Sequence, residues 1–166
     1  MGKETKLLYK ASRDGFSSEV FWEKCLGQKE TIALVQTDLN SVIGGYCPDQ
    51  WEDTTGKKDS RGVSDSKDIV SGKPFLFYFL DDQIEIIKHR DDVIPWMKSY
   101  KDCLVGFGNG FLINSGEESY AVANNEVWVW PENTGNLIRD DAGLLYFAGG
   151  DDFSFTTVDI EVWGLH

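Results

Sequence analysis

The order of apolar and polar residues predicts a chain built mainly from short β-strands. Runs rich in β-branched and aromatic residues, bounded by turn residues, are typical of strands. Such runs lie at residues 7–9, 31–35, 41–46, 75–80, 84–86 and 126–130. A turn sequence at 37–40 separates the second run from the third, so we expect these two strands to form a hairpin.

Two of these runs are apolar on both faces. Residues 75–80 are apolar throughout, and valine alternates with tryptophan in residues 126–130. Strands with two apolar faces are typically buried on both sides. We therefore expect a central buried strand at 75–80 and place Trp128 and Trp130 in the core, whereas residues 84–86 alternate as a half-buried strand does.

The last apolar run changes phase. Phe153 and Phe155 share one phase, and the opposite phase holds Val158, Ile160 and Val162. Side chains in a strand alternate between faces, so the phase can change only where a residue is inserted or the strand is interrupted. We predict a β-bulge or a strand break at residues 156–157.

One helix is predicted near the N-terminus. It follows a turn at residues 12–15, and Ser17 or Ser18 can cap it by accepting a hydrogen bond from a free backbone N–H group. Gly27 is placed to end it in a left-handed conformation. Its predicted apolar stripe consists of Phe21, Trp22, Cys25 and Leu26.

No domain boundary or repeat interrupts the chain, so we expect residues 1–166 to form a single domain of the α+β class, mainly β. Residues 52–68 contain one apolar residue, Val63, and are expected to form a mobile loop. Residues 131–141 are the second loop candidate.

Composition narrows the possible partners. The 28 acidic and 16 basic side chains give a net charge of -12, which repels nucleic acid and anionic lipid surfaces. Residues 1–6 lack a hydrophobic signal core, and the apolar run at 75–80 is too short to span a bilayer. The 3 cysteines form neither a disulfide framework nor a zinc motif. We expect a cytoplasmic protein without a transmembrane segment.

The sequence contains no enzyme signature. The glycines at 106, 108 and 110 are followed by a strand-like run, not by the helix that a phosphate-binding loop requires, so we assign them to close packing in a sheet. Aspartate pairs at 81/82, 91/92, 140/141 and 151/152 are typical of solvated turns. We predict no metal and no cofactor.

Candidate nucleophiles and bases are few. His89 lies among charged residues and is expected on the surface, and Cys25 is expected to be an inert core thiol because it lies on the helix stripe. Cys47 and Cys103 lie nearer to turns, which leaves a redox role open for both.

Several motifs together resemble the TLDc domain family. They are residues 7–9 followed by Ser-Arg-Asp-Gly-Phe-Ser at 12–17 and a helix, Gly-Gly-Tyr at 44–46, Trp51, Phe-Leu-Phe at 75–77, Gly-Phe-Gly at 106–108, Tyr-Phe-Ala-Gly at 146–149 and Ile-Glu-Val-Trp at 160–163. The resemblance implies a two-sheet antiparallel β-sandwich flanked by a few short helices. It also implies a non-enzymatic role in binding and regulating the vacuolar proton-pumping ATPase or in oxidative-stress resistance, with any membrane association indirect, through that complex. The chain departs from the family pattern at 109–113, which lacks the usual acidic residue.

The family motifs suggest candidate partner-binding residues. They are Arg13, Asp14, Gly44, Gly45, Tyr46 and Glu161. Structural roles remain open for the same residues: Asp14 can cap the start of a helix, Arg13 can pair with Glu161, and the glycines can serve sheet curvature. Two further functions also remain open, a structural subunit of a large assembly, for example a cytoskeletal one, and a thiol-based peroxide scavenger that uses Cys47 or Cys103.

Overall fold

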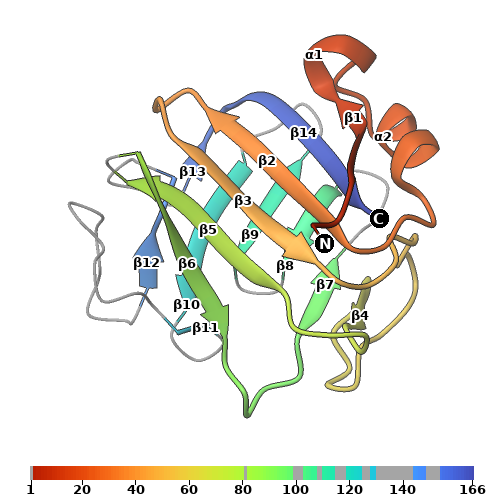
Figure 1. Ribbon diagram of the computed structural model, residues 1–166. Coiled ribbons are helices and arrows are strands. Elements are labelled where there is room, and N and C mark those ends of the chain that lie inside the picture. Colours follow the sequence, from red (N-terminus) through yellow and green to blue (C-terminus); the bar gives the residue numbers. More distant parts are fainter. Residues whose placement is uncertain are drawn as a thin grey trace.

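A computed structural model shows two antiparallel β-sheets stacked face to face, with two short helices at one end (Figure 1). It describes residues 2–80, 82–98, 103–107, 110–114, 119–124, 128–129, 144–148 and 154–166. The predicted mainly β sandwich with a few short helices is confirmed.

The first sheet contains the candidate site. Its seven described strands are, in spatial order, β1 (Thr5–Lys10), β14 (Thr157–Leu165), β2 (Thr31–Thr37), β3 (Val42–Cys47), β5 (Phe75–Leu80), β6 (Gln83–His89) and β11 (Trp128–Val129). The predicted hairpin is confirmed as β2 and β3, which pair from Thr31 opposite Cys47 to Gln36 opposite Val42. Asn40 supplies the left-handed turn residue, with φ of 57°.

The second sheet lies behind the first in Figure 1. Its described strands are, in order, β12 (Leu144–Tyr146), β10 (Ser119–Asn124), β9 (Phe111–Asn114), β8 (Cys103–Phe107), β7 (Trp96–Lys98) and β4 (Ser66–Asp68), and β13 (Ser154–Phe155) also pairs with β10. The predicted loop at 131–141 and Trp130 lie outside the described residues.

The predicted interruption at 156–157 marks the point where the chain changes sheets. β13 pairs with β10 in the second sheet, whereas β14 pairs with β1 and β2 in the first. Val158 is predicted to share a face with Ile160 and Val162, but it does not lie on their buried face. It is 47% exposed, because the pairing register shifts between Thr157 and Asp159. The break itself is confirmed.

The N-terminal helix is confirmed, with one change at its C-terminal end. α2 (Ser18–Cys25) is capped by the Ser17 hydroxyl, which accepts a hydrogen bond from the Val20 amide at 3.2 Å. Gly27 has a φ of 82°, as predicted. Leu26 is 56% exposed and not part of the buried stripe, because the helix ends at Cys25 and the backbone of Leu26 is extended.

Residues 12–15 form more than a turn. Ala11–Asp14 is a single helical turn, α1, which Gly15 ends with a φ of 106°. The Tyr9 hydroxyl donates a 2.7 Å hydrogen bond to the Gly15 carbonyl, which ties the end of α1 back to β1.

The core lies between the two sheets and beneath α2. Leu76 and Tyr78 of β5 point into it, as do Trp128 and Phe107. Gly110 allows close packing here: a Cβ at this position would lie less than 3.0 Å from Leu76. The other face of β5 points away from the core, so within the described residues this strand is not buried on both sides as predicted.

The segment 52–68 is more regular than its polar composition predicts. The Asp65 amide donates to the Lys57 carbonyl at 2.8 Å, and the Thr54 hydroxyl donates to the Asp65 carbonyl at 2.8 Å. The segment ends in β4, which pairs with β7. The expected open loop is therefore a folded excursion attached to the edge of the second sheet.

Candidate functional site

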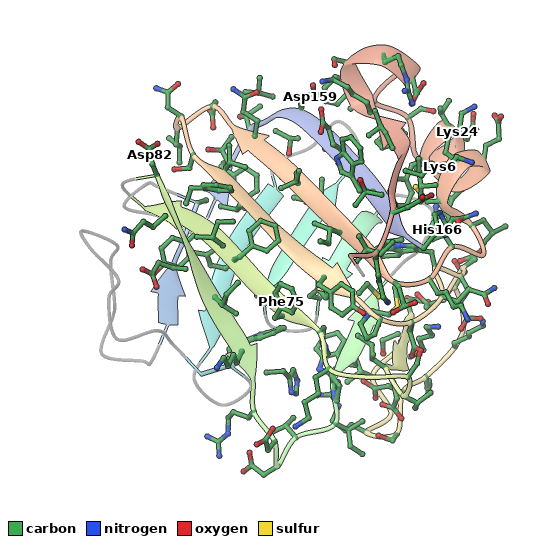
Figure 2. The ribbon with its side chains drawn as sticks, viewed as in Figure 1. Lys6, Lys24, Phe75, Asp82, Asp159 and His166 are labelled. Atoms are coloured by element: carbon green, nitrogen blue, oxygen red, sulfur yellow. The ribbon has the colours of Figure 1, made fainter. Side chains whose placement is uncertain are left out.

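Charged residues gather where α1 packs against β14. We call this set, Lys10, Ser12, Arg13, Asp14, Asp159 and Glu161, the polar corner. It forms because β1 leads directly into α1 and pairs with β14, which places Lys10 opposite Glu161. Figure 2 shows Asp159 near the start of β14, on the side of α1.

Asp14 organises α1. Its Oδ2 accepts a 2.9 Å hydrogen bond from the Lys10 amide, the residue before the helix, so Asp14 caps the start of α1 and not of α2. Arg13 donates to both oxygens of the same carboxylate, from Nε at 2.8 Å and from Nη2 at 2.7 Å. This two-point bond, with the bond from the Lys10 amide, lowers the pKa of Asp14 to about 2. The pair stays charged at neutral pH, and the Arg13 side chain remains 51% exposed.

Asp159 ties α1 to β14. Its carboxylate accepts hydrogen bonds from the Ser12 amide at 2.9 Å and from the Ser12 hydroxyl at 2.7 Å. Partial burial opposes ionisation, but these bonds and one from the Ile160 amide outweigh it, so the pKa of Asp159 is lowered.

Glu161 is held between two donors. Lys10 Nζ lies 2.7 Å from its Oε1, and the Trp163 indole donates to Oε2 at 3.0 Å. The bond from Lys10 is the main reason why the pKa of Glu161 is lowered. The pairing of Arg13 with Glu161 that the sequence left open does not form: β1 places Lys10 opposite Glu161, and Arg13 binds Asp14 instead.

β3 contains three of the candidate partner-binding residues, Gly44, Gly45 and Tyr46. A partner could contact the glycine backbone directly only in an exposed loop, and these residues do not form one. Both glycines are buried, and β3 is paired with β2 on one side and with β5 on the other. Tyr46 is half-buried and stacks on Phe75, with the ring centroids 5.1 Å apart.

The pairing registers connect β3 to the polar corner. One cross-strand row runs Lys10, Glu161, Leu34, Gly44, Phe77 and Ile86, each residue opposite the next in the neighbouring strand. Gly44 therefore shares the outer face of the first sheet with Glu161, while Gly45 points the other way because side chains alternate along a strand.

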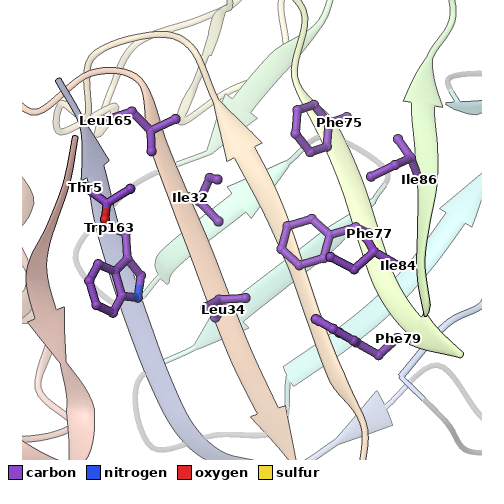
Figure 3. A pocket seen from close by; sticks show the side chains of 10 residues that line it. All are labelled: Thr5, Ile32, Leu34, Phe75, Phe77, Phe79, Ile84, Ile86, Trp163 and Leu165. Carbon is purple, nitrogen blue, oxygen red and sulfur yellow. The ribbon is translucent and has the colours of Figure 1, made fainter. Parts of the chain in front are cut away.

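This outer face carries a hollow of about 530 Å³ next to the polar corner. We call it the outer apolar face; its lining residues are Thr5, Ile32, Leu34, Phe75, Phe77, Phe79, Ile84, Ile86, Trp163 and Leu165 (Figure 3). Nine of the ten are apolar. Leu34 also lines a smaller polar depression with Lys10, Asp159 and Glu161, so the two regions are continuous.

Comparison with known proteins decides the family. A family model described as the TLDc domain matches residues 2–109, which is well over half of the chain. The chain belongs to the TLDc domain family. No curated protein matches it.

The match covers the N-terminal part of the chain. Residues 2–109 include the motif at 12–17, the Gly-Gly-Tyr of β3 and the Phe-Leu-Phe of β5. The closing Ile-Glu-Val-Trp at 160–163 lies beyond the matched residues. Within the described part of this TLDc domain, no helix has the length and apolar character to cross a membrane.

The described cysteines of this TLDc domain are poorly placed to act as nucleophiles. Cys25 and Cys47 are fully buried, and burial raises the pKa of each thiol to about 12, so neither is a thiolate at neutral pH. The side chain of Cys103 lies outside the described residues. Among the described residues, no group of three or more His, Cys, Asp or Glu side chains is arranged to hold a metal ion.

His89 is not the surface residue that its charged neighbours predict. It is 5% exposed and packs edge-on against Trp128, because residues alternate along β6 and the face of Ile87 and His89 points into the core. Burial is the main reason why the pKa of His89 is lowered.

Four residues of the site were missed by sequence reasoning: Lys10, Ser12, Asp159 and Trp163. The signal that would have found two of them, Lys10 and Asp159, is the pairing of the first strand with the last, which makes Asp159 and Glu161 neighbours of Lys10. The structure brings Arg13, Asp14 and Glu161 into one corner and separates Gly45 from it.

Proposed function

We propose that this TLDc domain is a non-enzymatic protein-interaction domain that binds and regulates the vacuolar proton-pumping ATPase through the polar corner. The observation that carries the proposal is the exposed Arg13 guanidinium, held in one orientation by its two-point bond to a carboxylate that is itself anchored to the backbone. Charged groups held in place before binding lose little conformational freedom when a partner docks.

Family membership supports the assignment, because TLDc domains are generally non-catalytic. The domain acts in the cytoplasm, and association with a membrane is indirect, through the ATPase complex. A role in oxidative-stress resistance follows from that regulation and not from thiol chemistry at Cys47, whose buried thiol has a raised pKa.

Affinity capture from native cytosol, with washes at low and moderate salt, tests the proposal. We expect recovery of the peripheral-stalk and catalytic subunits of the ATPase. Arg13→Ala should abolish that recovery with little change in melting temperature, because exposed ion pairs contribute roughly 0–1 kcal/mol to stability.

Arg90→Ala is the matched control. Arg90 binds Asp92 through the same two-point geometry, with Nε at 2.9 Å and Nη2 at 2.7 Å, and its side chain is 40% exposed. Its replacement should leave ATPase recovery unchanged. Equal losses from both variants would contradict a specific role of the polar corner.

The alternative function is that of a structural subunit in a large assembly. Recovery of a different complex, in fixed stoichiometry and resistant to salt, would favour that function over regulation of the ATPase. The acidic net charge and the continuous polar and apolar outer surface are compatible with either partner.

A further inference from the structure

The outer apolar face is not used by the fold itself. Phe75, Phe77 and Phe79 of β5 all point away from the second sheet, and Ile84 and Ile86 of β6 extend the same surface (Figure 3). Phe79 is 43% exposed and Ile84 is 56% exposed. Contiguous exposed apolar surface next to polar groups is typical of interaction sites.

The sequence of β5 indicates that this face is covered in the functional state. An antiparallel sheet with one face in water alternates apolar and polar residues, whereas a strand covered on both sides is apolar throughout. β5 reads Phe-Leu-Phe-Tyr-Phe-Leu, and among its described side chains Leu76 and Tyr78 are the ones in the core between the sheets. The alternate phenylalanines match the composition of a strand whose second face is also packed.

The backbone of the sheet determines what kind of element can cover it. Beneath the hollow, β14, β2, β3 and β5 are each paired with a neighbouring strand on both sides. Their peptide groups are already hydrogen-bonded, so an added strand would find no partners for its own N–H and C=O groups. An α-helix satisfies its own backbone internally and needs only apolar contact.

The dimensions suit a short helix. Phe75 and Phe79 are four residues apart in a strand, which corresponds to about 13 Å. A helix covers that distance in about nine residues, or between two and three turns. Apolar residues spaced three and four apart would meet the phenylalanines along its length.

Charge determines the polar side of that helix. At the end of the face near Leu34, the carboxylates of Asp159 and Glu161 share one ammonium group, that of Lys10. The net charge of the chain is -12. Both features attract a cationic partner and repel an acidic one.

A second copy of this chain is a poorer occupant. It carries the same negative charge, and α2, the longer helix in the described part of the chain, already buries its apolar side chains Phe21 and Cys25 in its own core. Anionic lipid is repelled for the same electrostatic reason.

We propose that the outer apolar face binds an amphipathic α-helix of a partner protein that carries lysine or arginine beside its apolar stripe. The inference rests on the proposed function only in taking the domain to bind protein; it does not require the partner to be the ATPase.

Fluorescence anisotropy with synthetic peptides tests this. The probe is a labelled helix of about 18 residues with leucine at positions i, i+3, i+4 and i+7 and lysine on the remaining surface. One control peptide has the same composition in scrambled order, and the other has glutamate in place of lysine. We expect the probe to bind the full chain and both controls to bind at least about tenfold more weakly, with probe affinity falling as salt rises.

Ile84→Thr should weaken probe binding about tenfold, because it removes an exposed apolar contact while retaining a strand-forming residue. Leu26→Thr is the matched control: Leu26 has the same 56% exposure but lies at the end of α2, outside the hollow. Thermal melting of both variants checks that the fold is intact. Phe79→Thr provides a second test from the neighbouring strand.

Equal binding of the probe and the scrambled peptide, or loss with Leu26→Thr but not with Ile84→Thr, would overturn the inference. So would a dimer of the free protein that Ile84→Thr dissociates, because a second copy would then occupy the face. Failure of the probe to bind a chain that still captures the ATPase would overturn this role of the face and leave the proposed function standing. Probe binding by a chain that captures no ATPase would overturn the proposed function and leave the inference about the face standing.

Discussion

Gly44 and Phe77 lie opposite each other in β3 and β5, and the Phe77 ring occupies the space where a side chain at position 44 would begin. A Cβ built on Gly44 would lie less than 3.0 Å from this ring and from the Ala33 carbonyl oxygen. The ring is therefore recessed and only 5% exposed, although it faces outward. Glycine at position 44 shapes the floor of the outer apolar face.

Gly44→Ala should destabilise the protein by about 1–3 kcal/mol, the usual cost of overpacking a tight site. One of the two obstacles is backbone, so a rotamer change of Phe77 alone cannot relieve it. Chemical denaturation measures the loss. Gly2→Ala, where nothing lies within 4 Å of the added carbon, should be neutral. Unchanged stability of Gly44→Ala would show that the sheet adjusts freely at β3.

Local features of this fold could be predicted from the sequence because neighbouring residues determine them. The Ser17 cap, the left-handed Gly27 and the break after Phe155 each depend on a few adjacent positions. The β2–β3 hairpin belongs to the same class, since its turn lies between its strands.

Features that depend on distant packing could not be predicted in this way. Charged neighbours indicated a surface His89, but alternation alone does not say which phase of a strand faces the core. Likewise Arg13 and Asp14 are sequence neighbours, whereas Lys10 and Glu161 are 151 positions apart and meet only through the pairing of the first strand with the last. That pairing assembles the polar corner.

His89 should make stability sensitive to mild acid. Its Nδ1 lies 2.8 Å from the Arg90 carbonyl, which can only accept, so Nδ1 carries the proton and Nε2 is the site that titrates. Nε2 is buried and has no hydrogen-bond partner among the described residues. Lys73 and Arg61 also disfavour a charge there, while Asp91 and the bond to Arg90 oppose the shift only in part.

The sign of the effect follows from the lowered pKa. The folded protein binds the proton at His89 at a lower pH than the unfolded chain, whose pKa is about 6.5. Stability is full above that value and falls as the pH drops through it toward the folded pKa. The melting temperature should therefore decrease between about pH 7.5 and about pH 5.5, and less so in His89→Gln. Identical pH profiles for the two proteins would contradict a neutral, buried His89.

Cys25 and Cys47 should be inert toward thiol reagents in the native protein. Both side chains are fully buried, so a reagent reaches them only after unfolding. Burial also raises the pKa of each thiol to about 12, which leaves no reactive thiolate at neutral pH. In a Cys103→Ser variant, which leaves two of the 3 cysteines, a chromogenic disulfide should label nothing until denaturant is added. Rapid labelling of the folded variant would reopen the thiol-based peroxide function at Cys47.

Asp59 should hold the segment 52–68 in place. Its carboxylate is buried and accepts hydrogen bonds from the Arg61 side chain at 2.6 Å and from the amides of Arg61 and Val63 at 2.9 and 3.0 Å. The Arg61 guanidinium in turn lies 4.6 Å from the Trp96 ring centroid, which connects the segment to β7. One carboxylate therefore links the backbone of the segment to the second sheet.

Asp59→Ala should expose the segment to trypsin at Lys57, Lys58 and Arg61, because each donor left without a partner costs roughly 1–3 kcal/mol. Limited proteolysis followed by mass spectrometry locates the cleavages. Asp53→Ala is the matched control, since Asp53 is exposed and its carboxylate accepts hydrogen bonds from the amide and hydroxyl of the nearby Thr55. If both variants resisted trypsin as the unmodified chain does, the hydrogen bonds of Asp59 would not be what orders this segment.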